Sequence, residues 1–87
     1  MFNVKFSIQI KNSLKKIKKK NLKLFNMFEK KVFQIINLNK ESINHFKNLR
    51  KPLNHLKRVH IGSFILTFEV KESLIIFEDF VHHDKAY

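Results

Sequence analysis

The last third of the chain, residues 56–87, most constrains the fold, because it has the pattern of three β-strands joined by two tight turns. Apolar and polar residues alternate imperfectly over residues 56–61 and clearly over residues 64–70. Such alternation is typical of strands with one buried face. Between these two segments lie Gly62, the only glycine, and Ser63, which together predict a hairpin turn.

A second turn leads into a third strand. Residues 71–73 (Lys-Glu-Ser) predict that turn, and residues 74–81 are apolar on both faces. A strand that is buried on both faces lies inside a sheet rather than at its edge. A polar tail closes the chain, so we expect the rest of the chain to support or cover this sheet.

The N-terminal part predicts one strand and two helices. Residues 2–6 alternate as a short half-buried strand. Ser7 is a candidate N-cap for a basic amphipathic helix of about three turns that begins at Ile8. Asn21 is a candidate break and N-cap for a second helix over residues 22–38, whose apolar residues repeat at helical spacing without Gly or Pro.

Residues 39–55 hold turn-forming residues and the only proline, Pro52, which predicts an irregular connection rather than a central strand. The element order is therefore β-α-α-β-β-β. This order predicts an α+β fold: a mostly antiparallel four-stranded sheet with the N-terminal helical hairpin packed on one face. With 87 residues, the chain is expected to form a single domain over residues 1–87, with a small core.

Composition and charge limit the classes of function. The chain has no cysteine, which excludes a disulfide framework and a thiolate zinc site. Its apolar runs are too short to span a bilayer, so we expect a cytoplasmic protein with no membrane partner. The formal net charge is +11, and residues 1–40 hold eleven Lys and one acid, Glu29, which gives +10. This excess favours a polyanion or an acidic partner; a solvated lysine-rich surface is the alternative.

The open face of the sheet and the tail carry the residues with usable chemistry. An arginine can hold a phosphate oxygen, a histidine can move protons near neutral pH, and a carboxylate can act as a base. Such a set suits RNA cleavage in which the neighbouring 2′-hydroxyl attacks the phosphate, a reaction that needs a base, an acid and a cation but no metal ion. The residues in question are Arg58, His60, Glu69, His82, His83 and Tyr87.

Each of these residues also has a plainer interpretation. Arg58 and His60 can be solvated strand residues, and Glu69 can pair with Arg58 or Lys57 across the hairpin. The lysine-rich first helix can bind a membrane surface, although it lacks an interfacial Trp and has a core to pack on. These alternatives stay open from the residues alone.

The tail raises the question of a metal site. His82, His83 and Asp84 are all of metal-binding types. Adjacent residues of a strand point in opposite directions, however, and this argues against a shared ion. The sequence analysis therefore predicts no metal site, and the tail histidines can equally be a polar chain end.

Residues 46–70, FKNLRKPLNHLKRVHIGSFILTFEV, and the tail HHDKAY resemble the RelE/ParE superfamily of toxins from prokaryotic toxin–antitoxin pairs, above all its archaeal RelE branch. That family has a Lys-x-Leu segment, a Pro-Leu approach to a strand, a strand–turn–strand unit around a Gly, and a tail that ends in Tyr. Length and element order agree as well, so the resemblance covers the whole chain. The matching residues are Lys47, Leu49, Pro52, Leu53, Arg58, Gly62, Phe64, Phe68, His82 and Tyr87.

The resemblance implies a compact toxin that cleaves mRNA in the decoding site of the ribosome, without a metal ion or other cofactor. It also implies a RelB-like antitoxin that wraps the toxin surface in a hetero-oligomer. Carried over by position, the expected catalytic residues are Arg58, His60, His82, His83 and Tyr87, and the expected RNA-binding residues are Lys47, Arg50, Lys51 and Lys57.

The chain departs from the family pattern at three cationic positions. Ile65 stands where an Arg usually follows the aromatic residue of the turn, and His60 and His83 replace two other Arg residues. Charge-assisted contacts to phosphate are worth roughly 1.5–3 kcal/mol each. Their loss favours one alternative, a degenerate toxin that only binds antitoxin. The ParE branch, which shares the fold, supplies a second alternative, an inhibitor of DNA gyrase.

Overall fold

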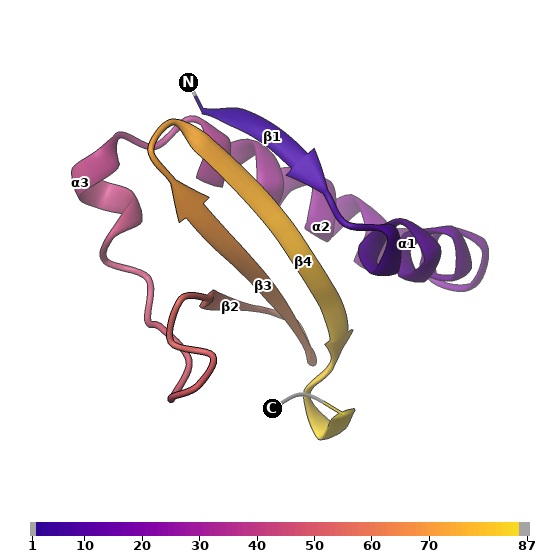
Figure 1. Cartoon of the computed structure of the whole chain (residues 1–87). Coiled ribbons are helices and arrows are strands. Elements are labelled where there is room, and N and C mark those ends of the chain that lie inside the picture. Colours follow the sequence, from indigo (N-terminus) through magenta and orange to yellow (C-terminus); the bar gives the residue numbers. More distant parts are fainter. Residues whose placement is uncertain (1, 86–87) are drawn as a thin grey trace.

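The computed structural model describes residues 2–85 and shows an α+β fold (Figure 1). Its elements follow the order β-α-α-β-β-β, as predicted, with one short helix added before β2. They are β1 Asn3–Phe6, α1 Ile8–Lys20, α2 Leu22–Ile36, α3 Lys40–Ile43, β2 Lys57–Ile61, β3 Phe64–Lys71, β4 Leu74–His82 and a 3-10 turn, η1, at His83–Lys85. None of the helices in this described part has the length and apolar character needed to cross a membrane.

Polar caps define the helical hairpin, as the sequence predicted. The Ser7 side chain accepts a hydrogen bond from the backbone N–H of Ile10 at 3.1 Å and so begins α1. Asn21 ends α1 by donating its backbone N–H to the Ile17 carbonyl, and its side chain accepts from the Leu24 N–H at 3.1 Å. One asparagine therefore closes the first helix and opens the second.

The sheet has the strand order β1-β4-β3-β2. The β2–β3 and β3–β4 pairs are antiparallel, and β1 pairs with β4 in parallel, so the prediction of a mostly antiparallel sheet is confirmed. A parallel pair needs a long connection, and here the whole of the chain from α1 to β3 separates the two strands. β4 lies inside the sheet, as its apolar character on both faces predicted.

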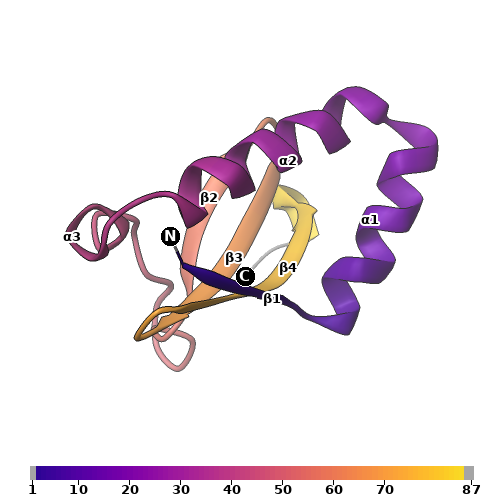
Figure 2. The same ribbon diagram turned by 90° about the horizontal axis from the view of Figure 1, so that it is seen from above.

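The core fills the space between the helices and one face of the sheet. Figures 1 and 2 show α1 and α2 on the same side of the sheet, with the opposite face free of helices. The Phe28 ring of α2 lies 4.9 Å from the Phe80 ring of β4, and Phe68 lies 5.8 Å from Phe77. The fully buried apolar residues include Ile10, Ile35, Leu66, Phe68, Ile75 and Phe77.

The β2–β3 turn holds the C-terminal tail in place. Gly62 has a φ of +59°, a conformation that residues with a Cβ rarely adopt, which explains the only glycine of the chain. The carbonyl of the next residue, Ser63, accepts a hydrogen bond from the backbone N–H of His83 at 2.9 Å. The predicted hairpin turn is thus confirmed, and it also anchors the start of η1.

Candidate functional site

The predicted RNA-binding residues gather where the connection after α3 meets β2. The backbone N–H of Arg58 donates to the Lys47 carbonyl at 2.9 Å, and the N–H of Leu49 donates to the Leu56 carbonyl at 2.9 Å. The segment 47–49 therefore runs alongside the start of β2. This pairing places Lys47 next to Arg58, as the prediction of a shared RNA-binding surface requires.

Arg58 lines two surface hollows. One has a volume of about 460 Å³ and is also lined by Arg50 and Lys51; the other has a volume of about 350 Å³ and is also lined by Lys47 and His60. We call Lys47, Arg50, Lys51 and Arg58 the cationic cluster. Within residues 2–85, no carboxylate lies at ion-pair distance from any member of this cluster. An unpaired cation can bind an anion without first giving up a partner.

Lys57 does not belong to this cluster, although the sequence predicts an RNA contact for it. The residue is 9% exposed, and its Nζ donates to Asn48 Oδ1 at 3.1 Å and to the Phe46 carbonyl at 3.4 Å. Strand alternation turns it toward the helices, opposite to Arg58. Lys57 therefore holds the segment that carries Lys47 and lies apart from the cationic cluster.

The register of the sheet separates the predicted catalytic residues. Arg58 lies opposite Thr67 in the β2–β3 pair. His82 lies opposite Phe64 in the β3–β4 pair, three residues earlier along β3. Two strand spacings and three residues amount to roughly 14 Å between the Cα atoms of Arg58 and His82. The His82 ring packs edge-on against Phe64, 5.5 Å between centroids, on the helix-covered side, whereas His60 shares the open face with Arg58.

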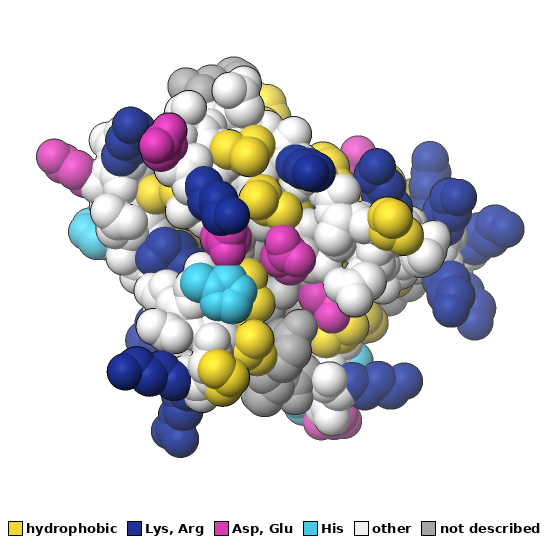
Figure 3. Space-filling view, in the orientation of Figure 1, with side chains coloured by type: hydrophobic (Ala, Val, Ile, Leu, Met, Phe, Trp, Pro, Cys, Tyr) yellow, Lys and Arg dark blue, Asp and Glu magenta, His cyan; other side chains and the backbone are white. Residues whose placement is uncertain are grey.

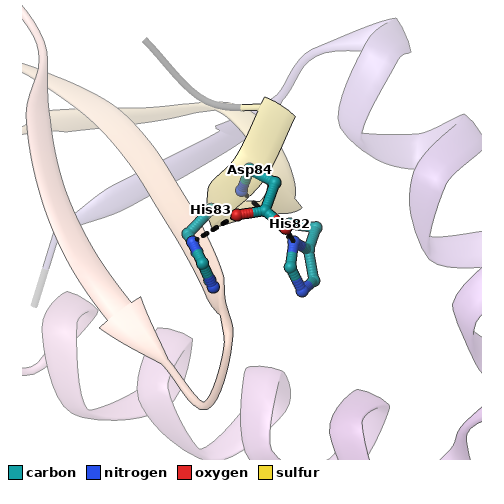
Figure 4. Close-up of side chains that lie close together, drawn as sticks. All are labelled: His82, His83 and Asp84. Atoms are coloured by element: carbon teal, nitrogen blue, oxygen red, sulfur yellow. Dashed lines mark hydrogen bonds and ion pairs between the residues drawn. The ribbon is translucent and has the colours of Figure 1, made fainter.

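The two tail histidines come together with Asp84 (Figure 4). His83 Nδ1 lies 3.0 Å from Asp84 Oδ1, His82 Nδ1 lies 3.5 Å from Asp84 Oδ2, and the two imidazole rings stack with centroids 4.5 Å apart. The expectation that His82 and His83 point in opposite directions is wrong. The strand ends at His82 and η1 begins at His83, so the alternation on which that expectation depended stops between them.

Glu69 and Tyr87 are the two remaining residues for which the sequence predicted a role in the site. Glu69 pairs with Lys71 at 3.3 Å and with His55 at 3.9 Å, so the alternative in which it pairs with Arg58 or Lys57 is wrong. Tyr87 lies outside the described residues, and its catalytic role stays a prediction.

Sequence reasoning missed one residue at these places, His45, and set aside another, Asp84. His45 lines the same hollow as Lys47 and Arg58, and Asp84 joins the tail histidines. His45 reaches its place only through the pairing of segment 47–49 with β2, for which the local sequence carries no signal. Asp84 was visible as a neighbour of two histidines, and only the strand argument set it aside.

Positive charge is spread unevenly over the open side of the molecule. In Figure 3, Lys and Arg side chains gather most densely over α1, a second group lies over the connection before β2, and others are scattered across the face. Hydrophobic, acidic and histidine side chains mix in the centre of this face. The lysine excess of the N-terminal half is therefore displayed mainly on α1, apart from the cationic cluster.

Comparison with known proteins assigns the family. A Methanocaldococcus jannaschii protein named as a candidate toxin, RelE4, is 39% identical over 90 residues, which cover 100% of this chain and 92% of the relative. This chain belongs to the RelE toxin family. The relative comes from an archaeon, which confirms the predicted archaeal RelE branch. No protein-family model matches the chain.

Solved structures of other RelE-family toxins share the fold. A chain of the E. coli DinJ–YafQ toxin–antitoxin complex superposes with a TM-score of 0.78 at 19% identity, over 99% of this chain and 97% of that one. A chain of the Staphylococcus aureus YoeB–YefM toxin–antitoxin complex superposes with a TM-score of 0.75 at 16% identity, over 95% and 98%. The predicted RelE-like architecture is confirmed by these superpositions.

Proposed function

We propose that this RelE-family chain is the toxin of a toxin–antitoxin pair and that it acts in the cytoplasm by cleaving mRNA on the ribosome. The observation that carries the proposal is the cationic cluster around two hollows that share Arg58. Its members face solvent without carboxylate partners among residues 2–85, which suits the phosphates of a single RNA strand. Membership of the RelE family supports the same reaction.

The proposed chemistry uses the RNA's own nucleophile. The 2′-oxygen attacks the adjacent phosphorus, the bond from phosphorus to the 5′-oxygen of the next nucleotide breaks, and a 2′,3′-cyclic phosphate and a 5′-hydroxyl result. A base accepts the proton of the 2′-hydroxyl and an acid donates one to the leaving oxygen. Arg58 would stabilise the negative charge that builds on the phosphorus oxygens.

We assign one proton transfer to His60, because it lines the same hollow as Arg58 and is exposed. The second proton-transfer group is expected from the tail, where His83 and Tyr87 are the candidates. His82 lies against Phe64 on the helix-covered side, so we leave it out of the proton-transfer pair. Lys47, Arg50 and Lys51 would hold the RNA backbone on either side of the cleaved bond.

We also propose a RelB-like antitoxin as the partner. A groove of about 340 Å³ between α1 and α2 is lined mainly by apolar side chains, among them Leu14, Phe25 and Phe33, together with Lys11 and Glu29. Phe33 is 65% exposed. An amphipathic, acidic segment of an antitoxin would bury these side chains and face the lysines of α1. The DinJ–YafQ and YoeB–YefM neighbours, solved as complexes, support such a hetero-oligomer.

The test is inducible expression followed by measurement of translation and of mRNA ends. The unmodified chain should arrest growth and leave cut mRNA. Arg58→Ala and His60→Ala should each lower the cleavage rate, Arg58→Ala by about 10- to 150-fold, which corresponds to one charge-assisted contact of roughly 1.5–3 kcal/mol. Lys30→Ala, which removes an exposed lysine of α2, is the matched control and should leave cleavage unchanged.

Other outcomes separate the alternatives. Intact mRNA and normal growth, with a folded protein that still captures the product of the neighbouring gene, would show a degenerate toxin that only binds its antitoxin. Growth arrest with intact mRNA and inhibited DNA supercoiling would show a ParE-type gyrase inhibitor. Either result contradicts the nuclease proposal.

A further inference from the structure

The junction between β4 and η1 brings together three side chains that can each ligate a metal ion. One ligand atom from each of His82, His83 and Asp84 lies within 4.8 Å of the other two. Two imidazoles and a carboxylate form a donor set that suits Zn²⁺ and its neighbours Ni²⁺ and Cu²⁺. In Figure 4 the two imidazole rings flank the Asp84 carboxylate.

The donors lie within reach of a single ion, although they are not yet at ligand spacing. Zn²⁺ bonds of about 2.0–2.1 Å place neighbouring donors of a tetrahedral ion roughly 3.3–3.4 Å apart. His83 Nδ1 lies 3.0 Å from Asp84 Oδ1, His82 Nδ1 lies 3.5 Å from the other carboxylate oxygen, Oδ2, and one ligand atom from each residue lies within 4.8 Å of the other two. Because all three side chains are at least 39% exposed, rotations about their side-chain bonds can close the remaining distance.

The hydrogen bonding around His82 leaves this imidazole able to ligate an ion. The backbone N–H of Asp84 donates to His82 Nδ1 at 3.2 Å, so this nitrogen already offers its lone pair to a donor. A metal ion would take up the same lone pair, and Asp84 Oδ2 lies 3.5 Å from this nitrogen.

We propose that His82, His83 and Asp84 form a binding site for one divalent transition-metal ion, with Zn²⁺ as the preferred ion. Ligation through His82 Nδ1 releases the Asp84 N–H, which lies at the exposed surface, where water can accept its hydrogen bond. The remaining coordination position is open to water. The site would tie the end of β4 to η1, and its binding of an ion can be measured without RNA or antitoxin. While the ion is bound, His83 is a ligand and cannot serve as the second proton-transfer group of the proposed cleavage.

The test measures Zn²⁺ binding to the full chain, produced without a histidine tag and freed of metal by a chelator. Isothermal titration with zinc chloride should show one saturable site per chain. His82→Ala, His83→Ala and Asp84→Asn should each weaken binding roughly tenfold or more, since the loss of even an outer partner of a metal ligand costs 10–100-fold. Magnesium chloride should give no binding, because Mg²⁺ prefers an all-oxygen shell.

Matched controls come from the other histidines. His45→Ala and His55→Ala remove exposed imidazoles outside the site and should leave Zn²⁺ binding unchanged. Histidine NMR signals of the unmodified chain should shift with Zn²⁺ for residues 82 and 83 and not for residue 45, which tests the site without any variant. Absence of saturable binding, or equal affinity in the His82→Ala/His83→Ala double variant with its fold confirmed by circular dichroism, overturns the proposal.

Discussion

Replacing Lys57 by Met tests whether a buried lysine positions the cationic cluster. The residue is 9% exposed, and its ammonium group donates to Asn48 Oδ1 at 3.1 Å and to the Phe46 carbonyl at 3.4 Å. Methionine keeps an unbranched apolar side chain that can fill most of the same space but removes both hydrogen bonds. The segment that carries Lys47 then loses its side-chain attachment to β2.

The two hydrogen bonds set the expected magnitude. A hydrogen bond from a charged donor contributes roughly 1.5–3 kcal/mol, and the 3.1 Å bond to Asn48 qualifies. The 3.4 Å contact to Phe46 is too long to add much. Removing a buried charge returns part of the loss, so we expect Lys57→Met to lower the free energy of unfolding by about 1–2 kcal/mol. For a domain of this size, that loss corresponds to a fall in Tm of about 4–16 °C.

Thermal unfolding followed by circular dichroism measures this fall, with Lys71→Met as the matched control. Lys71 also makes an ion pair, at 3.3 Å to Glu69, but its side chain is 66% exposed, and such a surface pair contributes only about 0–1 kcal/mol. Equal shifts in Tm for the two variants would refute the assignment of Lys57 as a buried anchor. A folded Lys57→Met protein should also cleave mRNA more slowly below its Tm.

Three further substitutions test other parts of the structure. Ile65→Arg introduces the residue that the family usually has at this position. Ile65 is only 8% exposed, so losing its buried apolar side chain should destabilise the fold by about 1.5–3 kcal/mol. An unchanged midpoint of urea unfolding would contradict this expectation. Ser7→Ala removes the N-cap of α1 and the hydrogen bond that Ser7 donates to the Glu78 carbonyl. In the same urea titration, it should lower the free energy of unfolding by about 1–2 kcal/mol, and Ser13→Ala should not reproduce this effect. Phe33→Glu should weaken antitoxin capture without lowering Tm, because Phe33 lines the groove and is 65% exposed. Gln34→Glu is the control and should leave capture unaffected. Equal capture by the two variants would exclude the groove as the antitoxin-binding site.

The sequence predicted the elements well because each one carries a local signal. Ser7 and Asn21 cap the helices that their side chains predicted, and Gly62 occupies the left-handed turn that its position between two strands predicted. α3 was missed because it has only one turn, Lys40–Ile43, in a segment of turn-forming residues. The parallel pairing of β1 with β4 also lies beyond local pattern, since it depends on where the helices return the chain.

The site was less predictable because it depends on pairing and register. Lys47 and Arg58 become neighbours only when segment 47–49 pairs with β2, and no residue in either segment indicates that pairing. Strand alternation correctly placed Arg58 and His60 on the open face. The same rule failed at His83, because a strand pattern does not state where the strand ends and a 3-10 turn begins.

Net charge by itself does not locate the cationic cluster that we propose as the RNA-binding site. Residues 1–40 carry +10, yet the cationic cluster comes entirely from residues 41–87, whose seven Lys and Arg and six acids leave only +1. Two of those six acids are engaged elsewhere: Glu69 with Lys71, and Asp84 with the tail histidines. What matters at contact distance is whether a cation lacks a carboxylate partner, because exposed charges beyond about 8–10 Å are largely screened by salt. The α1 lysines are therefore suited to speed the approach of the protein to RNA, and the cationic cluster is suited to hold the bound RNA in position. Neutralising the α1 lysines should slow association with RNA more at low salt than at high salt. Cleavage of RNA that is already bound should stay intact.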